Sequence, residues 1–209
     1  MTLPVAPNPC IEKLLTRTSL AGAFMGPPAP DDAQLEMILG AAQRAADHRR
    51  VRPWRFFVVR PEHYEAFFDR LAAAATRVQG DPARYEQNRE KYRLTARAPL
   101  LVVAAAHIDT QHKVAPIEQA FAAAGATQLV LNAAHAMGYA AFLFSGAGVF
   151  DEPFKASLGL APHDHLIGFI CLGTANGPGK PGPSAAEAVQ AGLEKTVKQW
   201  DPQETYLRP

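Results

Sequence analysis

Two hydrophobic periods alternate along the chain. Apolar residues spaced three or four apart predict amphipathic helices, and short runs of aromatic and β-branched residues predict strands. The predicted helices are 10–17, a helix capped by Asp31 or Asp32 and ended by Pro53, 61–79, 81–98, 117–138, 152–159 and 184–193. The predicted strands are 54–60, 99–108, 139–144 and 165–173, with 195–200 as a short final strand and 18–30 as a Gly/Pro loop. This irregular mixture predicts an α+β or α/β fold with one main sheet.

The segment 117–138 differs from the other predicted helices because it is apolar on almost every side. Such a helix is predicted to run buried through the middle of the molecule. Its stretch AFAAAGA lets another backbone approach closely. In a monomer of 209 residues the same surface would leave too much apolar area in water, so the pattern favours a homodimer.

Composition narrows the class of protein. A chain with 48% hydrophobic and 20% charged residues is globular rather than disordered, and 209 residues suit one domain. The net charge of +1 gives no general attraction for nucleic acid or an anionic membrane. Cys10 and Cys171 are too far apart to indicate a disulfide framework or a metal cluster. The start of the chain does not resemble a signal peptide, and no apolar run reaches the roughly 18 to 20 residues of a membrane span, so we expect a cytoplasmic protein.

Several motifs that carry catalytic chemistry do not occur in the sequence. No G-x-G-x-x-G follows a strand, and neither a P-loop nor a nucleophile elbow is present. The triplet HDH at 163–165 offers two histidines, but no other ligand has fixed spacing to it, so a plain surface turn is favoured over a metal site. We therefore predict no metal.

Two cationic spots remain as candidate chemistry. Arg17 and Ser19 follow the first predicted helix, and a guanidinium beside a hydroxyl suits a phosphate, although such an arginine often only meets the last helical carbonyls. In RAADHRRVRPWRFFVVR (44–60), Arg44 and His48 would share one helix face if the preceding helix continues that far. This segment is a solvated loop or a site for a phosphorylated, planar ligand.

A third spot is the stretch LFSGAG at 143–148. Here a predicted strand ends in small residues, which would let a ligand approach the backbone. On its own this pattern is weak evidence for a site.

Taken in order, these segments resemble the FMN-dependent nitroreductases. The matching pieces are RTS near the N-terminus, RAADHRRVRPWRFFVV, RAPLLVVAAA, HKV, EQAFAAAGA, MGYAAFLFSG and IGFICLGT. The likeness runs from about Ile11 to Thr174 and is nearest to the short bacterial NAD(P)H nitroreductases that carry Asp-His upstream of Pro-Trp. That combination is the specific part of the match, whereas the individual Arg and Ser matches are not specific.

The resemblance implies an α+β fold in which helices flank a central mixed or antiparallel sheet. It implies a tight homodimer with two flavins at the interface. A single domain over 1–209 is expected, with a C-terminal extension of about 175–209 that wraps the partner subunit. The predicted strand 195–200 would then add to the partner's sheet.

The resemblance also implies FMN as cofactor and assigns residues to it. The residues implied at the flavin are Arg17, Thr18 through its backbone, Ser19, Arg44 and His48, together with Leu143, Phe144 and Ser145 from the other subunit. A looser inference links Ala133, Ala134, His135, Ala136, Met137 and Gly138 to the nicotinamide of NAD(P)H. No catalytic side chain is predicted, because the flavin carries the chemistry. Phe144 stacks on flavin or substrate, or it fills the core; the sequence leaves both readings open.

Two departures from the family pattern affect the expected cofactor site. Thr18 and Phe144 stand where the short members have arginine, so two cations are missing. Each lost charged contact would cost on the order of 1.5–3 kcal/mol of cofactor binding. FMN would then become dissociable unless Arg49, Arg50 or Lys180 compensates.

The function implied by the resemblance is FMN-dependent transfer of hydride from NAD(P)H to nitroaromatics, quinones or similar flat acceptors, by a ping-pong mechanism. Two alternatives stay open. One is a flavoenzyme of the same fold that acts on an unknown metabolite. The other is a non-catalytic dimeric binding protein with a degenerate flavin site, for which Thr18 and Phe144 are the best evidence. Nucleic acid and membrane are not expected partners.

Overall fold

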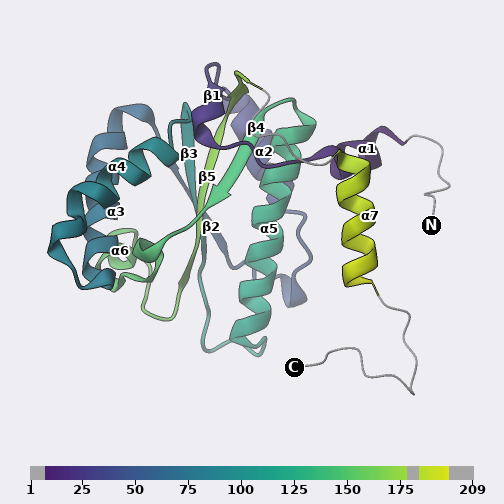
Figure 1. The fold of residues 1–209 in the computed structure, drawn as a ribbon. Coiled ribbons are helices and arrows are strands. Elements are labelled where there is room, and N and C mark those ends of the chain that lie inside the picture. The colour runs from purple at the N-terminus through teal and green to yellow at the C-terminus, as the bar shows by residue number, and fades with distance from the viewer. Residues whose placement is uncertain (1–7, 178–183, 198–209) are drawn as a thin grey trace. The chain divides into compact units, whose positions relative to one another are not determined.

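The chain forms two compact units in the computed structural model, which describes residues 8–177 and 184–197. One unit consists of 1–17 and 180–209, and its described part holds helices α1 (Pro9–Thr16) and α7 (Ala185–Thr196), which contact each other (Figure 1). The other unit, 18–179, contains the sheet and the remaining helices.

A single antiparallel sheet forms the centre of the larger unit. Its strands are β1 (Met25–Gly26), β2 (Trp54–Val59), β3 (Leu100–Ala106), β4 (Ala140–Phe144) and β5 (His165–Ala175). β3 lies between β2 and β5, and β5 also pairs with β4 and, further along its length, with β1. β3 is buried along its whole length, as its run of apolar residues predicts.

Helices cover both faces of this sheet (Figure 1). On one face lie α2 (Asp32–Ala42) and α5 (Pro116–Ala136). On the other lie α3 (Tyr64–Gln79), α4 (Tyr85–Thr95) and α6 (Glu152–Ser157). Because alternate residues of a strand face opposite sides, Leu101 and Val103 of β3 join the core under α3, whereas Val102 joins the core under α5. The predicted α+β architecture is confirmed.

The segment 18–30, predicted to be only a loop, contains a short 3₁₀ turn at Gly22–Phe24 and the two-residue strand β1. Met25 pairs with Ala175 of β5, a residue far along the chain. A strand this short has no hydrophobic period of its own, so the local pattern could not predict it.

Helix α5 is buried on one side only, which corrects the prediction that it runs buried through the molecule. Its buried residues are Gln119, Ala122, Ala123, Ala126, Thr127, Val130, Leu131 and Ala134. On the opposite side, the side chains of Ile117 and Phe121 are 58% and 66% exposed. The helix is apolar all round, as the sequence indicates, but the single chain covers only half of it.

The predicted strand at 195–200 is wrong where the structure describes it. Lys195 and Thr196 form the last turn of α7, because the helical pattern continues past Leu193 without a breaker. Residues 198–200 lie outside the described part of the chain. Among the described helices, none is long and apolar enough to cross a membrane.

Candidate functional site

The loop between α2 and β2 carries two of the predicted flavin residues. α2 begins as predicted, with the Asp31 side chain accepting from the Gln34 backbone, but it ends at Ala42, well before Pro53. Arg44 lies in the turns that follow, and His48 begins a separate 3₁₀ turn. The two residues therefore do not share a helix face, and that prediction is wrong.

Side-chain contacts fix the two ends of this loop. At its start, the Gln43 side-chain carbonyl accepts a hydrogen bond from Trp54 Nε1 at 3.2 Å, which ties the end of α2 to β2. Further on, His48 Nδ1 lies 3.5 Å from Glu118 Oε1 in the first turn of α5. His48 is thus placed at the N-terminal end of α5, with its side chain 59% exposed.

The same loop holds three arginines in the left-handed region of backbone conformation. Arg49, Arg50 and Arg52 have φ values of 61°, 57° and 51°. This conformation costs about 1–2 kcal/mol for each residue that carries a Cβ. The Asp47 carboxylate stabilises the turn by accepting from the Arg52 backbone N–H at 2.7 Å. All three arginines are exposed, so the loop presents a cationic surface of fixed shape.

The tripeptide 17–19 falls at the boundary between the two units. Arg17 ends the first unit, and its guanidinium Nη1 is buried without a hydrogen-bond partner in the described part of the chain. Thr18 and Ser19 are exposed, and the following Leu20 donates its backbone N–H to the Ala141 carbonyl of β4 at 3.2 Å. The structure therefore places Ser19 near the start of β4.

The end of β4 carries the predicted residues 143–145. Phe144 is buried, and its ring centroid lies 5.2 Å from that of Phe169 and 6.5 Å from that of Tyr92. Of the two readings that the sequence leaves open, the structure favours a core role for this side chain. Leu143 is half-buried on the opposite face of the sheet, and Ser145 is exposed.

The small residues after β4 do not leave room for a ligand at the backbone, which corrects the interpretation of LFSGAG. A Cβ on Gly146 would lie 2.6 Å from the Tyr92 hydroxyl oxygen. A Cβ on Gly148 would lie 2.7 Å from Leu71 Cδ1 and 3.1 Å from the Leu71 carbonyl oxygen. Glycine is needed at these two positions because α3 and α4 pack directly against the backbone there.

Gly148→Ala should therefore destabilise the fold by about 1–3 kcal/mol, because the added methyl overpacks the contact with α3. Urea unfolding followed by circular dichroism measures the loss. Gly40→Ala in α2 is the matched control, since a Cβ there meets nothing within 4 Å and alanine favours the helix. Equal stability of Gly148→Ala and wild type would contradict the close packing.

The segment predicted to bind NAD(P)H, 133–138, lies at the C-terminal end of α5 and in the turn after it. α5 has 21 residues and is about 30 Å long at 1.5 Å per residue. Within one chain, this segment and His48 are therefore at opposite ends of the helix. The structure instead brings the start of β4, which follows 133–138, next to the segment of Ser19, because the Ala141 carbonyl accepts from the Leu20 backbone N–H at 3.2 Å.

One polar cluster was missed by sequence reasoning. Asp164, the centre of HDH, is buried and accepts hydrogen bonds from the backbone of Ile108 at 2.7 Å and of Ala161 at 2.8 Å. His107 Nδ1 lies 3.2 Å from the same carboxylate. Burial by itself would raise the pKa of Asp164, but these hydrogen bonds outweigh it and hold the pKa below its usual value.

Asp164 thus joins the end of β3 to the start of β5 rather than lying on a plain surface turn. Lys155 of α6 adds to the same region, since its ammonium donates to the Pro162 and Asp164 carbonyls at 2.6 and 3.0 Å. In the described residues, no three His, Cys, Asp or Glu side chains are grouped to hold a metal ion. His107 lies near the end of one predicted apolar strand and Asp164 directly before another, but nothing in the sequence indicates that the two residues meet.

Cys171 lies in the middle of β5 and is fully buried. Burial raises the pKa of its thiol to about 12, so the thiol stays protonated near neutral pH. This cysteine is a core residue and no nucleophile.

The sheet and its two helical layers define a class of α+β protein that solved structures share. A nitroreductase-like family protein from Bacillus cereus has a TM-score of 0.67 at 18% identity, covering 90% of this chain and 96% of its own. A nitroreductase with bound FMN from Bacteroides fragilis NCTC 9343 has a TM-score of 0.64 at 17% identity, covering 97% and 100%. These likenesses show the fold.

Sequence comparison shows the family. A profile of the nitroreductase family matches residues 15–174. The protein named "Putative NAD(P)H nitroreductase YdjA" from Escherichia coli strain K12 is 33% identical over 164 residues, which cover 78% of this chain and 87% of that protein. The chain belongs to the nitroreductase family, a family of oxidoreductases. The resemblance inferred from its motifs is confirmed.

Proposed function

We propose that this protein is an FMN-dependent oxidoreductase that takes hydride from NAD(P)H and reduces nitroaromatics, quinones or similar flat acceptors. The observation that carries the proposal is the buried Nη1 of Arg17, which lacks an acceptor among the described residues. A buried donor left unpaired costs about 1–3 kcal/mol, and a phosphate oxygen would satisfy it. Relatives of this fold were crystallised with bound FMN, whose phosphate is a ligand of this kind.

The residues of the tripeptide 17–19 fit one end of such a cofactor. Arg17 would supply a charged fork, Ser19 an exposed hydroxyl, and Thr18 its backbone N–H. When bound, FMN would accept the hydride from NAD(P)H and return it to the second substrate. The protein's own side chains then need only to bind and orient both ligands and to keep water away. One binding site used by both substrates in turn gives the ping-pong order that we propose.

The remaining predicted flavin residues support a site built from two subunits. Ser145 is separated from Ser19 by most of β4, and His48 lies at the far end of α5 from 133–138. A second copy of the chain would supply the strand-end residues Leu143, Phe144 and Ser145 beside the first copy's arginine loop. With Phe144 in the core, the contribution of this segment would come from Ser145 and from backbone groups.

Exposed apolar side chains support the same homodimer. Ile117 and Phe121 on α5 are 58% and 66% exposed, and the apolar side of α1 is exposed as well. A monomer seldom keeps this much apolar surface in water. We propose that α5 packs against its copy and that the C-terminal extension, about 175–209, wraps the partner subunit.

Phe121→Glu should convert the dimer to a monomer, because it places a charge in the centre of the apolar face of α5. Light scattering after size exclusion measures the mass. Val78→Glu is the control: Val78 is 44% exposed on α3, across the sheet from α5, and should leave the mass unchanged. A wild-type protein that is already monomeric would refute the proposed assembly.

The proposed activity is tested on the purified protein. We expect the absorption bands of oxidised flavin, their loss when NADH or NADPH is added without oxygen, and their return when a nitroaromatic or quinone follows. Parallel lines in double-reciprocal plots would establish the ping-pong order. A colourless protein that does not quench the fluorescence of added FMN would refute the proposal and favour a non-catalytic binding protein.

A further inference from the structure

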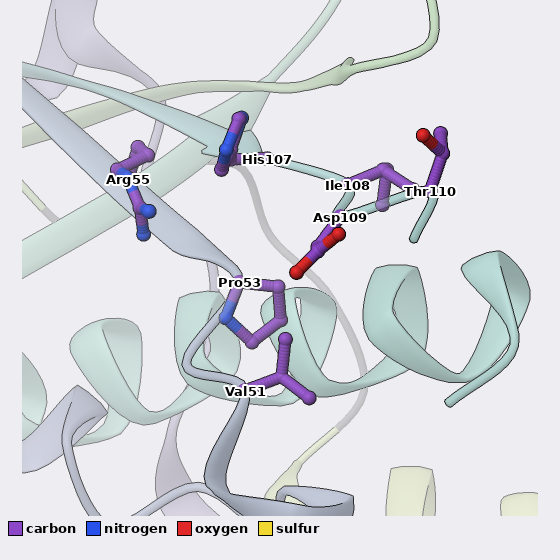
Figure 2. Close-up of a pocket in the computed structure, with 7 residues that line it drawn as sticks. All are labelled: Val51, Pro53, Arg55, His107, Ile108, Asp109 and Thr110. Atoms are coloured by element: carbon purple, nitrogen blue, oxygen red, sulfur yellow. The ribbon is translucent and has the colours of Figure 1, made fainter. Parts of the chain in front are cut away.

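A pocket of about 370 Å³ opens between the arginine loop, β2 and the segment that follows β3. Figure 2 shows Arg55 and Asp109 on opposite sides of it, His107 above, and Val51 and Pro53 below. Its volume falls in the range of small-molecule sites, which begins at about 300 Å³. Val51, Pro53 and Arg55 belong to the segment 44–60 that the sequence offers as a candidate site, whereas the lining residues from His107 to Thr110 were not predicted as part of a site.

Arg55 supplies a guanidinium that is held in position yet keeps donors free. Its Nη1 donates to the backbone carbonyls of Arg52 and Trp54, both at 2.9 Å. Its Nε and Nη2 have no acceptor among the described residues. A planar guanidinium fixed in this way is suited to bind two oxygens of a phosphate or carboxylate.

His107 is fixed from behind by Asp164. The ionised carboxylate of Asp164 only accepts hydrogen bonds, so Nδ1 of His107 donates to it over 3.2 Å. Nε2 is then the ring atom that remains available to a ligand, and its imidazolium form donates from there. The pairing orients the ring as a buried carboxylate does behind other functional histidines.

Asp109 supplies a negative charge and hydrogen-bond acceptors to the pocket. Its carboxylate accepts from the Gln111 backbone at 2.9 Å through Oδ1, which leaves Oδ2 for a hydroxyl donor. The backbone of Asp109 exchanges two hydrogen bonds with the buried side chain of Gln119, each 2.9 Å long. The wall that holds His107 and Asp109 is therefore rigid before any ligand arrives.

The arginines around the pocket lack ion pairs, unlike several arginines elsewhere in the described chain. No carboxylate of the described chain forms an ion pair with Arg44, Arg49, Arg50, Arg52 or Arg55. In contrast, ion pairs with carboxylates are formed by Arg60, Arg77, Arg84, Arg89 and Arg93. Cations gathered in one segment without internal counter-ions raise the local concentration of anions. The loop and the pocket together are suited to a ligand with more than one phosphate.

We propose that this pocket binds the phosphorylated adenosine ribose of NADPH, with Arg55 contacting the 2′-phosphate and thereby selecting NADPH over NADH. This inference rests on the proposed function and specifies its hydride donor. His107 contacts the same phosphate, and Asp109 accepts from the neighbouring ribose hydroxyl. An arginine contact to the 2′-phosphate is how other dinucleotide sites distinguish the two cofactors.

The position of the pocket agrees with this assignment. Val51 at its floor follows His48 by three residues, a stretch that spans at most about 10 Å of chain. A dinucleotide with its nicotinamide beside His48, one of the residues proposed to contact the flavin, would pass its pyrophosphate along Arg49, Arg50 and Arg52. Its phosphorylated ribose would then enter the pocket.

The test is equilibrium binding of adenosine 2′,5′-bisphosphate and of 5′-ADP to the full-length protein, measured by calorimetry. We expect the 2′,5′-bisphosphate to bind about 10- to 100-fold more tightly, as for a charged hydrogen-bonded contact. Arg55→Gln should abolish this preference and should raise the KM for NADPH by a similar factor, with kcat and the KM for NADH unchanged. Arg55 is exposed, so the variant should keep the wild-type melting temperature.

Arg70→Gln is the matched control, because Arg70 is an exposed arginine on α3 that likewise has no ion pair with a described residue. Equal binding of the two nucleotides to wild type, or an unchanged preference in Arg55→Gln, would overturn the inference. Competition by inorganic phosphate as strong as that of the nucleotide would also overturn it, by showing a general anion site. Nucleotide binding measured by calorimetry does not depend on turnover, so it tests the pocket alone. The flavin spectrum separately tests the proposed oxidoreductase function.

Discussion

Arg17→Ala is expected to release most of the FMN while the protein remains folded. In this chain Thr18 takes the place of a second arginine, so the proposed phosphate contact depends on one guanidinium. Its loss should cost about 1.5–3 kcal/mol of binding, a weakening of FMN affinity by about 10- to 150-fold. The ratio of flavin to protein absorbance after gel filtration measures the effect, and fluorescence quenching of added FMN gives the dissociation constant.

Two controls separate a lost contact from a damaged fold. Lys13→Ala removes an exposed cation of α1, one helical turn before Arg17, and should keep the wild-type flavin content. Arg17→Lys keeps the charge without the fork and should fall between wild type and Arg17→Ala. If Arg17→Ala retains as much flavin as wild type, Arg17 does not belong to the cofactor site.

Asp164→Ala should destabilise the protein by about 3–5 kcal/mol, because it leaves buried donors without their carboxylate. The backbone N–H groups of Ile108 and Ala161 would lose their acceptor, and His107 would lose its partner. Unfolding in guanidinium chloride, followed by fluorescence, measures the change. Glu36→Ala is the control, since Glu36 is an exposed carboxylate of α2 without a partner among the described residues.

The pH dependence of Asp164→Ala gives a second readout. The pKa of Asp164 is lowered in the folded state, so its contribution to stability is present above about pH 4, the unfolded value, and is lost as the pH falls through the folded value. The stability difference between wild type and variant should therefore shrink at acid pH. A difference that stays constant down to pH 2 would show that ionisation of Asp164 is not what stabilises the fold.

The strands β2 to β5 could be predicted from the sequence because each is a short apolar run bounded by polar or Gly/Pro segments. The helices α3, α4 and α6 were also predicted from the sequence. The end of α2 could not be predicted, because no glycine or proline marks it and the turn depends on the distant indole of Trp54. The exposed side of α5 also escaped prediction, since the sequence does not say which half of an apolar helix a single chain covers.

The candidate site could be predicted only in part, because the sequence shows the chemistry of residues but not which distant segments meet. Residue chemistry and family resemblance proposed Arg17, Ser19, Arg44 and His48 as candidates, whereas the separation of Ser19 and His48 along α5 needed coordinates. The pairing of His107 with Asp164 joins residues 57 positions apart. Nothing in local sequence reports such a contact, and an aspartate between two histidines resembles a solvent-exposed turn.

The left-handed arginines of the loop have a consequence for the stability of the protein. Glycine at Arg49, Arg50 and Arg52 would remove a conformational penalty of about 3–6 kcal/mol, which is substantial for a fold whose net stability is about 5–15 kcal/mol. Selection for thermal endurance alone would therefore favour glycine at these positions. With arginine at these positions the chain gives up stability and gains charge, a trade of the kind that proteins make where ligands bind.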